Sequence, residues 1–454
     1  MISNYIKVAL LMASSLFMQF LDATIVTTAL PYIGRSLNVP TSSLSLTVSI
    51  YFITMAIFIP LSGWIAKRIG KKNAWLLATL LFVLSSLGDA IAPTFSFLLV
   101  SRFIQGFAGS LMTPTARLIM LEKTPSNQLL RMANYLVWPA LIAPAIAPII
   151  GGFFVKYLTW QWIFLINVPI GLLAIIIGIK LVEKDTQKSS TKFDFLGFIE
   201  IAISSGFILI GAEIATYGRE YWPTAGILVL IGLLMILVVG HHLSHVDNPL
   251  FDIKALKVSS FRIYQTGGTF LWLSVGALPY LLTVYLQTVF NWSALVAGYY
   301  VIFVFIGNIG IKPFTNVIIR HIKYKASLLI ALFTVGISTA ALAWIQPTTI
   351  GFIIAGLAFI SGCGRSLALT CYNAVTFSEI PMDERNSANT LSSVLQTMAQ
   401  GLGVSLITVV VSALSSFVSV NTAYEYGFIF LGILMLYPII EVFIQPRDFG
   451  SKAL

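Results

Sequence analysis

The sequence predicts an all-α membrane protein of about fourteen transmembrane helices, arranged as two six-helix bundles with two extra helices between them. Of its 454 residues, 57% are hydrophobic and only 10% are charged, whereas roughly 25% of the residues in soluble domains are charged. Apolar runs of about 20 residues, each able to cross a bilayer as a helix, recur along the whole chain. One pair of these apolar runs lies between two sets of six, an arrangement that is common in transporters with a central cavity.

The predicted crossings follow one another through short connections. The first six lie at 7–30, 44–66, 73–92, 95–121, 131–155 and 161–183, the extra pair at 195–216 and 222–241, and the last six at 260–284, 294–318, 326–346, 349–377, 389–415 and 422–444. They divide the chain into an N-terminal six-helix bundle (1–183), a linker with the central two-helix hairpin (184–258), and a C-terminal six-helix bundle (259–454).

The basic residues of the loops predict the orientation. One side of the predicted bundle carries Lys67, Arg68, Lys71, Lys72, Lys123, Arg131, Lys184, Lys188, Lys192, Lys254, Lys257, Arg262, Arg320, Lys323, Lys325 and Arg385. The opposite loops hold only Arg35, Lys156 and Arg219. Because basic loops stay in the cytoplasm, we expect a multi-pass protein of the plasma (inner) membrane with both termini cytoplasmic. Topology thus explains the net charge of +10, and nucleic-acid binding is not expected.

Other features that resemble chemical sites have simpler explanations. The segment HHLSHVD (241–247) has a histidine spacing that could hold a metal, but it falls at a predicted helix end, so no metal site is expected. Glu200 and Glu213, on the extra hairpin, are expected to be rim or packing residues rather than proton carriers. No nucleotide-binding loop, nucleophile elbow or metalloprotease signature occurs. We therefore expect neither an enzyme nor a cofactor, and no ATP-driven transport.

One aspartate interrupts the first apolar run, in the segment LDATIVTTALP (21–31). Gln19 and Asp22 are three residues apart and share one face of the predicted helix, and Arg102 and Gln105 do the same on the fourth. A charge in the middle of a bilayer costs at least ~2.5–3.5 kcal/mol, so both charges should face the interior and a partner. We therefore expect Asp22 and Arg102 to form a pair inside the first bundle.

This pair has two possible roles. Burial favours a protonated carboxyl group and a nearby guanidinium favours a carboxylate, so a change in solvent access can shift the balance. A proton taken from outside would then release Asp22 from Arg102, and substrate binding could compete for the same site. The alternative is a static ion pair that joins two helices.

A third buried charge is predicted in the second half, at Arg365 in ISGCGRSLALTCYN (360–373). This half offers no obvious acid in the middle of the membrane. We expect Arg365, with Asn373 and Gln265, to line the substrate cavity beside Gln19 and Gln105 and to favour a substrate with an anionic group. The alternative is an arginine that is paired for structural reasons or extends to the interface.

The loop SGWIAKRIGKK (62–72) resembles the signature of the major facilitator superfamily, Gly-x-Leu-Ala-Asp-Arg-x-Gly-Arg-Lys. The residues that match are Gly63, Ala66, Arg68, Gly70, Lys71 and Lys72. Lys67 stands where the family has an aspartate that takes part in a latch between the two halves. Two further segments resemble motifs of the same superfamily: LLVSRFIQGFAGS (98–110) on the fourth helix, and APAIAPIIGG (143–152) on the fifth, with Pro144, Pro148, Gly151 and Gly152.

The order of several segments is similar to that in the fourteen-helix drug:proton antiporters of the EmrB and QacA type. The segments are LDATIVTTALP (21–31), WQWIFLINVPIG (160–171), FDFLG (193–197), NPLFDIKAL (248–256) and YLQTVFNWSALVAG (285–298). This resemblance implies the major facilitator fold and a monomer in the lipid bilayer that exports small molecules against protons by alternating access. It also implies that the fifth-helix motif is a hinge and a seal, with simple close packing as the alternative.

Two other functions stay open at this point. The first is a proton-coupled exporter of one metabolite, such as an organic acid, which Arg365 and the small number of acids favour. The second is a transporter-like sensor or scaffold that moves nothing. Lys67 in place of the usual aspartate, and Ala147 in place of the usual glycine before the proline of the fifth-helix motif, allow this function, but the Asp22–Arg102 pair disfavours it.

Overall fold

The computed structural model describes residues 4–40, 43–123, 129–183, 193–246, 249–250, 253–376, 379–380 and 385–446. All regular elements of these segments are helices. Twelve of them are long and apolar enough to cross a membrane, and Ile142–Tyr157 and Ala294–Gly310 are shorter apolar helices. This confirms the predicted all-α membrane fold.

The helices form three consecutive sets. The first comprises α1 (Asn4–Leu37), α2 (Ser45–Ile69), α3 (Lys71–Ala90), α4 (Phe95–Lys123), α5 (Leu129–Tyr157), α6 (Trp162–Leu165) and α7 (Asn167–Leu181). The extra hairpin comprises α8 (Phe195–Ile214) and α9 (Trp222–His245). The last comprises α10 (Ser259–Thr288), α11 (Ala294–Gly310), α12 (Lys312–Ala341), α13 (Gly351–Thr376), α14 (Arg385–Ser415), α15 (Val420–Ile433) and α16 (Leu436–Ile444).

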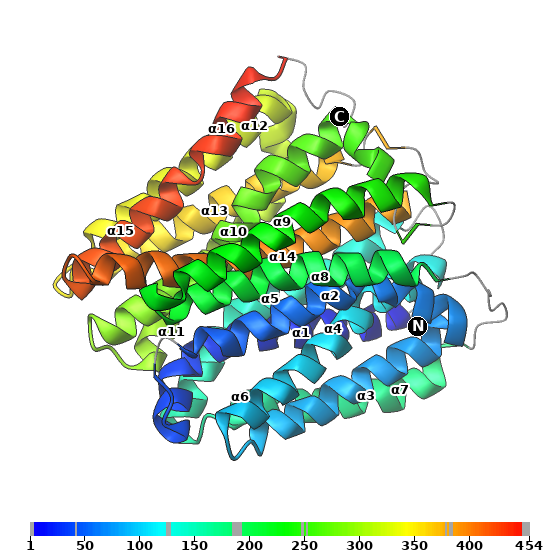
Figure 1. The fold of residues 1–454 in the computed structure, drawn as a ribbon, viewed down its shortest axis with the longest axis horizontal. Helices are drawn as coiled ribbons and strands as arrows, with labels where there is room; N and C mark the ends of the chain where they lie inside the picture. The colour runs from blue at the N-terminus through cyan, green and yellow to red at the C-terminus, as the bar shows by residue number, and fades with distance from the viewer. Residues whose placement is uncertain are drawn as a thin grey trace.

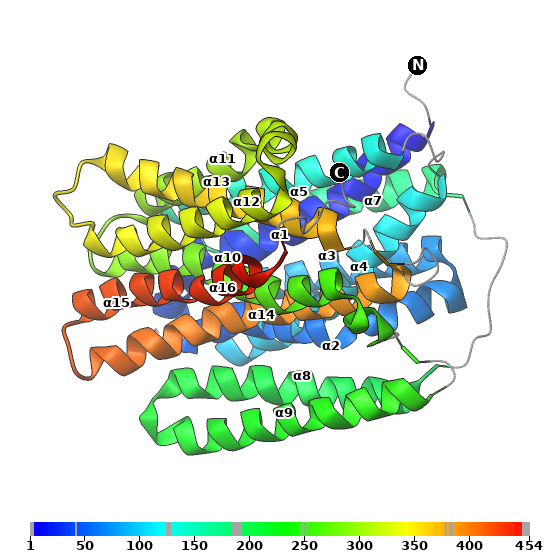
Figure 2. The same ribbon diagram turned by 90° about the horizontal axis from the view of Figure 1, so that it is seen from above.

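Each large set packs mainly within itself, so we call them the first and the second bundle. In the first bundle α1 packs on α5 and α4 packs on α2 and α3, while in the second α13 packs on α11 and α12. Two pairs of helices make most of the contact between the bundles, α5 with α11 and α2 with α14, and α1 also contacts α10 and α11. The hairpin α8–α9 lies along one edge, where α8 contacts both α2 and α14 (Figure 2).

The two bundles are inclined to each other. In Figure 1 the helices of the second bundle draw away from those of the first toward the end of the molecule where both chain termini lie. We call this end the terminal side and the opposite end the distal side. The α2–α3 turn lies on the terminal side, and the connection from α1 to α2 lies on the distal side (Figure 1).

The turn between α2 and α3 depends on one glycine. Gly70 has φ 92° and ψ 145°, a backbone conformation that L-residues with a side chain rarely adopt. Lys72 then donates from Nζ to the carbonyl oxygens of Ile179 (2.7 Å) and Val182 (2.5 Å), at the end of α7. A lysine at carbonyls without helical partners stabilises a helix C-terminus. The loop motif therefore joins the start of α3 to the end of α7 on the terminal side.

The remaining residues of this loop motif differ in their exposure. Lys67 and Arg68 are exposed, Lys71 is half-buried, and a Cβ atom at Gly63 would meet no atom within 4 Å. Lys67 forms no ion pair with a described residue.

One predicted boundary in the second bundle differs from the structure. The crossing predicted at 294–318 continues through α11 and the start of α12 to Lys323, where φ 65° and ψ 164° interrupt the helix. Pro313 lies in the first turn of α12, directly after the short break between α11 and α12, a position where proline leaves no helical hydrogen bond unmade. Lys312 therefore lies inside a crossing rather than at its end.

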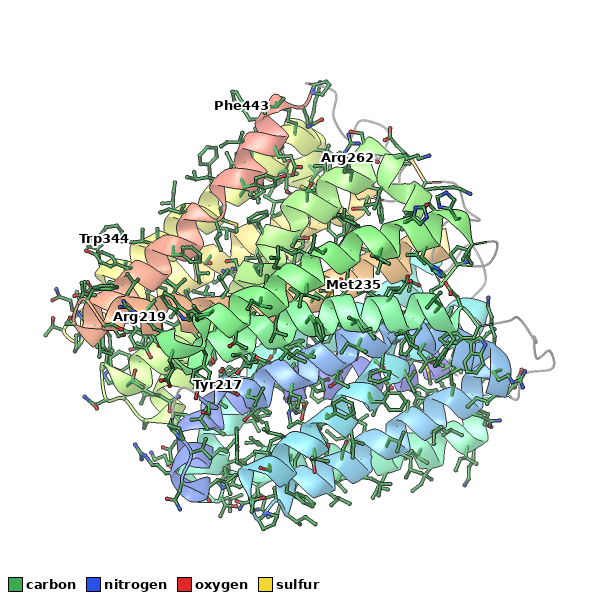
Figure 3. All side chains as sticks on the ribbon, in the orientation of Figure 1. Tyr217, Arg219, Met235, Arg262, Trp344 and Phe443 are labelled. Carbon is green, nitrogen blue, oxygen red and sulfur yellow. The ribbon has the colours of Figure 1, made fainter. Side chains whose placement is uncertain are left out.

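The outer surface is apolar over most of its length. Leu237 on α9 is 71% exposed, Trp344 on the distal side 71% and Phe443 on the terminal side 69% (Figure 3). Polar ends flank this surface, with Arg219 on the distal side and Arg262 on the terminal side (Figure 3). Such a surface is suited to lipid and not to water.

Candidate functional site

The two charges expected to face each other form a buried ion pair. Arg102 on α4 donates from Nη1 to Oδ2 of Asp22 on α1 over 2.5 Å, and neither side chain is exposed. A bond of this kind between two ions is stronger than one between neutral groups. The structure therefore gives Asp22 the partner that a membrane-embedded carboxylate needs, while the role of the pair in proton coupling stays a prediction.

Hydrogen bonds from two helices, α4 and α7, complete the surroundings of Asp22. Gln105 donates from Nε2 to Oδ1 over 3.0 Å, and Asn167 of α7 donates from Nδ2 to the same oxygen over 3.2 Å. Arg102 also donates from Nη1 to Oε1 of Gln105 (2.5 Å) and from Nε to the carbonyl oxygen of Thr47 (3.0 Å). Only donors surround the carboxyl group, as an ionised carboxylate requires.

Aromatic rings and close helix packing enclose this pair. The Tyr51 ring centre lies 4.5 Å from Cζ of Arg102 and that of Phe164 lies 5.8 Å away, so both rings can stabilise the cation. A Cβ atom at Gly106 would lie 2.6 Å from the carbonyl oxygen of Tyr51, so only glycine allows α4 this close to α2. The low dielectric of such a site strengthens every interaction within it.

A second buried acid, Asp89, lies beside this pair although the sequence reading did not assign it a role. It is on the last turn of α3 and is fully buried, within electrostatic reach of Arg102 and Asp22. Neither of its carboxyl oxygens accepts a hydrogen bond from a described residue, and Nη2 of Arg102 has no acceptor there either. A single acid within a predicted apolar crossing is the signal that could have identified it, as it did for Asp22.

The polar face of α1 continues from Asp22 toward the terminal side. Thr113 of α4 donates to Oε1 of Gln19, whose Nε2 lies 3.6 Å from Sδ of Met55. Trp75 of α3 donates from Nε1 to Oγ of Ser15 over 2.7 Å. Gln19 and Gln105 are thus buried between helices, and their contact with a substrate stays a prediction.

Arg365, on α13 of the second bundle, has only neutral hydrogen-bond partners among the described residues. Arg365 is 2% exposed. It donates from Nη1 to the carbonyl oxygen of Ser274 (2.8 Å), from Nη2 to its Oγ (2.8 Å), and from Nε to Oγ of Ser361 (3.3 Å). No hydrogen bond joins it to Gln265, which is buried, or to Asn373, which is exposed. The structure therefore does not bring these three predicted cavity residues into one cluster, and their cavity role stays a prediction.

The fifth-helix motif lies where the two bundles cross. A Cβ atom at Gly152 would lie 2.5 Å from Cα of Leu295, and one at Gly298 would meet the carbonyl oxygen of Pro148. A Cβ atom at Gly151 would lie 3.0 Å from Cγ1 of Ile25, on the opposite side of α5. Small residues let helix backbones approach in this way. The motif, including the buried Pro144, therefore holds α5 between α1 and α11.

A carboxyl group from the hairpin joins the bundles at their second contact. Glu213 at the end of α8 accepts hydrogen bonds from Ser45 of α2 (2.8 Å) and Ser405 of α14 (2.9 Å). Oγ of Ser49 lies 3.1 Å from Oγ of Ser405. Glu213 is 2% exposed, so it is a packing residue and not a rim residue. The three serines lie toward the distal ends of α2 and α14, and α11 begins on the distal side as well. The bundles therefore meet on this side.

Comparison with known proteins assigns the fold. The family model of the Major Facilitator Superfamily matches residues 12–404. Two of the most similar solved structures are a POT family transporter in complex with 5-aminolevulinic acid (TM-score 0.73, 14% identity, 98% of this chain and 96% of that one) and a D-xylose-proton symporter (TM-score 0.69, 13% identity, 98% of each chain). At this level of identity the structures show a shared fold.

The sequence relatives cover most of the chain. A protein of Pectobacterium carotovorum subsp. carotovorum that carries the name multidrug resistance protein MdtD is 31% identical over 397 residues, which are 87% of this chain and 85% of that protein. A protein of Haemophilus influenzae that carries the name transport protein HsrA is 27% identical over 430 residues, 94% of this chain and 92% of that protein. The chain therefore belongs to the major facilitator superfamily.

Proposed function

We propose that this transporter exports small molecules, drugs among them, in exchange for protons. The observation that carries the proposal is the fully buried pair of Asp22 and Arg102 inside the first bundle. One proton on Asp22 removes the charge that holds Arg102, and a change in protonation can therefore change how α1 and α4 interact. The name of the relatives, multidrug resistance protein, supports drugs as substrates.

The arrangement of the bundles supports alternating access. They touch on the distal side, through α5–α11 and α2–α14, and draw apart on the terminal side (Figure 1). With both termini in the cytoplasm, as the loop charges predict, this is a state that takes up substrate from the cytoplasm. Protonation of Asp22 from the outside would then accompany release on the distal side. We propose a monomer in the plasma membrane, as is implied by the resemblance to drug:proton antiporters.

A specific observation favours a second substrate class, molecules with an anionic group. Arg365 and Lys312 lie inside crossings of the second bundle, and neither pairs with an acid in the described part of the chain. Lys312 donates from Nζ to Oγ1 of Thr370 over 3.0 Å. A metabolite exporter would use such cations to attract a carboxylate. A sensor or scaffold, in contrast, has no need of the buried Asp22–Arg102 pair.

Transport in proteoliposomes tests the proposal. We expect a proton gradient to drive uphill accumulation of ethidium, a lipophilic cation, or of carboxyfluorescein, an anionic dye. Asp22→Asn should abolish the accumulation, whereas Glu220→Gln, which removes an exposed acid on the distal side, should retain it. Accumulation by Asp22→Asn equal to that of the wild type would refute proton coupling through this pair. A protein that moves neither these dyes nor any metabolite down a gradient would be a scaffold.

A further inference from the structure

We propose that Asp89 is a second proton-carrying carboxyl group, which holds a proton while Asp22 is paired with Arg102 and passes it to Asp22 when Arg102 turns toward Asp89. The inference rests on the proposed proton coupling, and it adds the route by which the proton reaches Asp22.

The unequal surroundings of the two acids carry the inference. Asp22 accepts hydrogen bonds from Arg102, Gln105 and Asn167. Asp89 is just as deeply buried, yet neither of its oxygens has a donor among the described residues. A buried carboxylate without donors is strongly disfavoured, whereas a neutral carboxylic acid is tolerated. The proton in this cluster therefore belongs to Asp89.

Charge balance leads to the same assignment. The charged groups within electrostatic reach of Asp89 are Arg102 of α4 and Asp22 of α1, and the remaining titratable group of the cluster is Tyr51 of α2, whose ring contacts Arg102. Of the other helices on α3, α6 has no titratable residue, and the one on α7, Lys180, lies at its terminal end. One cation therefore faces two acids, and a single proton makes the buried cluster neutral.

One nitrogen of the Arg102 guanidinium group is available for the exchange of carboxylate partners. Nη2 of Arg102 has no acceptor among the described residues, while its Nη1 is bonded to Asp22. Helix α3 is close to α4 at this level, since a Cβ atom at Gly88 would lie 2.7 Å from Oγ of Ser101. A rotation of the guanidinium group toward α3 would thus exchange one carboxylate for the other without moving the helices.

Asp89 also lies on the side from which protons are expected to enter. It is on the last turn of α3, next to the distal end of the helix. One turn earlier on the same face, Ser86 accepts a hydrogen bond from Nε2 of Gln105 over 2.8 Å, and the same nitrogen donates to Asp22. A hydrogen-bonded path therefore leads from Asp22 through Gln105 to Ser86, which lies one helical turn from Asp89.

The proposed step balances in atoms and charge. The O–H bond of Asp89 breaks and an O–H bond forms on Asp22, while Arg102 moves from the carboxylate of Asp22 to that of Asp89. The cluster holds one proton and no net charge before and after the step, so the charge buried in the membrane does not change. Asp22 then releases its proton to the terminal side, and Asp89 takes the next one from the distal side.

Infrared spectroscopy of the purified protein tests where the proton is. At neutral pH we expect the wild type to show a C=O stretching band of a protonated carboxyl group that disappears in Asp89→Asn. The band should disappear in Asp22→Asn as well, because Arg102 then has only Asp89 to pair with and Asp89 ionises. Glu220→Gln, at an exposed acid, should retain it. A band of unchanged intensity in Asp89→Asn would overturn the proposal.

Transport separates this inference from the proposed function. We expect Asp89→Asn to lose gradient-driven accumulation of the dye that the wild type transports, while it still exchanges dye down a gradient. Loss of accumulation in Asp22→Asn with full accumulation in Asp89→Asn would overturn the role of Asp89 and leave the antiporter intact. Full accumulation in both variants would overturn the proposed function itself. If Asp89→Asn does not fold, Asp89→Glu decides, because the band of the protonated group should then shift in frequency, and a band at the wild-type frequency would overturn the proposal.

Discussion

Among the described residues, one arginine of each bundle is almost fully buried, and these two arginines have different partners. Arg102 is on the fourth helix of the first bundle and binds the carboxylate of Asp22 on the first helix, α1. Arg365 is on α13 and binds the hydroxyl and carbonyl oxygens of Ser274 on α10, the first helix of the second bundle. In both bundles the buried arginine therefore binds a residue of the first helix, which is an acid in the first bundle and a serine in the second.

Because of this difference, the ion pair of the first bundle can respond to pH, whereas the positive charge of Arg365 in the second bundle stays fixed. An ion pair between Asp22 and Arg102 ends when the carboxyl group takes up a proton, whereas the bonds from Arg365 to Ser274 do not respond to pH because neither serine oxygen titrates near neutrality. Proton coupling can thus reside in the first bundle alone. The second bundle supplies a permanent positive charge, which suits a role in packing or in attraction of an anionic substrate.

The largest expected effect is a difference in stability between the variants that lack one or the other arginine. Arg102→Met leaves Asp22 buried without its cation, and loss of one partner of a buried pair costs roughly 3–5 kcal/mol. Arg365→Met loses hydrogen bonds to neutral groups but also removes an unpaired charge, so its cost should be about 1–2 kcal/mol or less. Thermal unfolding in detergent measures both. Equal losses of stability would contradict the comparison between the bundles.

A smaller change is expected when the second bundle receives the missing acid. Ser274→Asp places a carboxyl group within reach of Arg365, and the new charge-assisted bond should raise the free energy of unfolding by roughly 1–3 kcal/mol. Ser274→Asn is the matched control, because it has the same shape without the charge. A melting temperature of Ser274→Asp at or below that of the control would show that Arg365 does not require an anion.

The sequence predicts the pair in the first bundle for a physical reason. An acid within an apolar helix must have a partner, and Arg102 is a buried cation on the fourth helix of the same bundle, which can meet the first. The same logic applies to Asp89, but its place near the end of the predicted crossing 73–92 resembles an interfacial position. Nothing in the sequence distinguishes Ser274 from the many other serines as the partner of Arg365.

Contacts between the bundles are the hardest to predict. Glu213 and Ser405 are 192 positions apart along the chain, so no local pattern joins them. The inclination of the bundles depends on many such contacts together. The fold class, in contrast, follows from the lengths of the apolar runs, because a helix is the simplest way to satisfy backbone hydrogen bonds in lipid.

The smallest effect is expected at Glu213, which contacts both bundles and belongs to neither. Glu213→Gln keeps the shape but leaves one acceptor oxygen in place of two for Ser45 and Ser405, and should weaken the distal contact by about 1 kcal/mol. Spin labels at the exposed positions Asn38 and Phe417, one in each bundle, would report a larger population with separated distal ends.

Proton coupling should survive this change, because Glu213 lies outside the Asp22 cluster. We expect the dye accumulation ratio of Glu213→Gln to stay at the wild-type level while the distance distribution shifts, and Glu220→Gln to change neither. A loss of accumulation at Glu213 as large as that in Asp22→Asn would mean that an acid outside the first bundle also carries protons. The contrast between a titrating first bundle and a permanently charged second one would then have to include the hairpin.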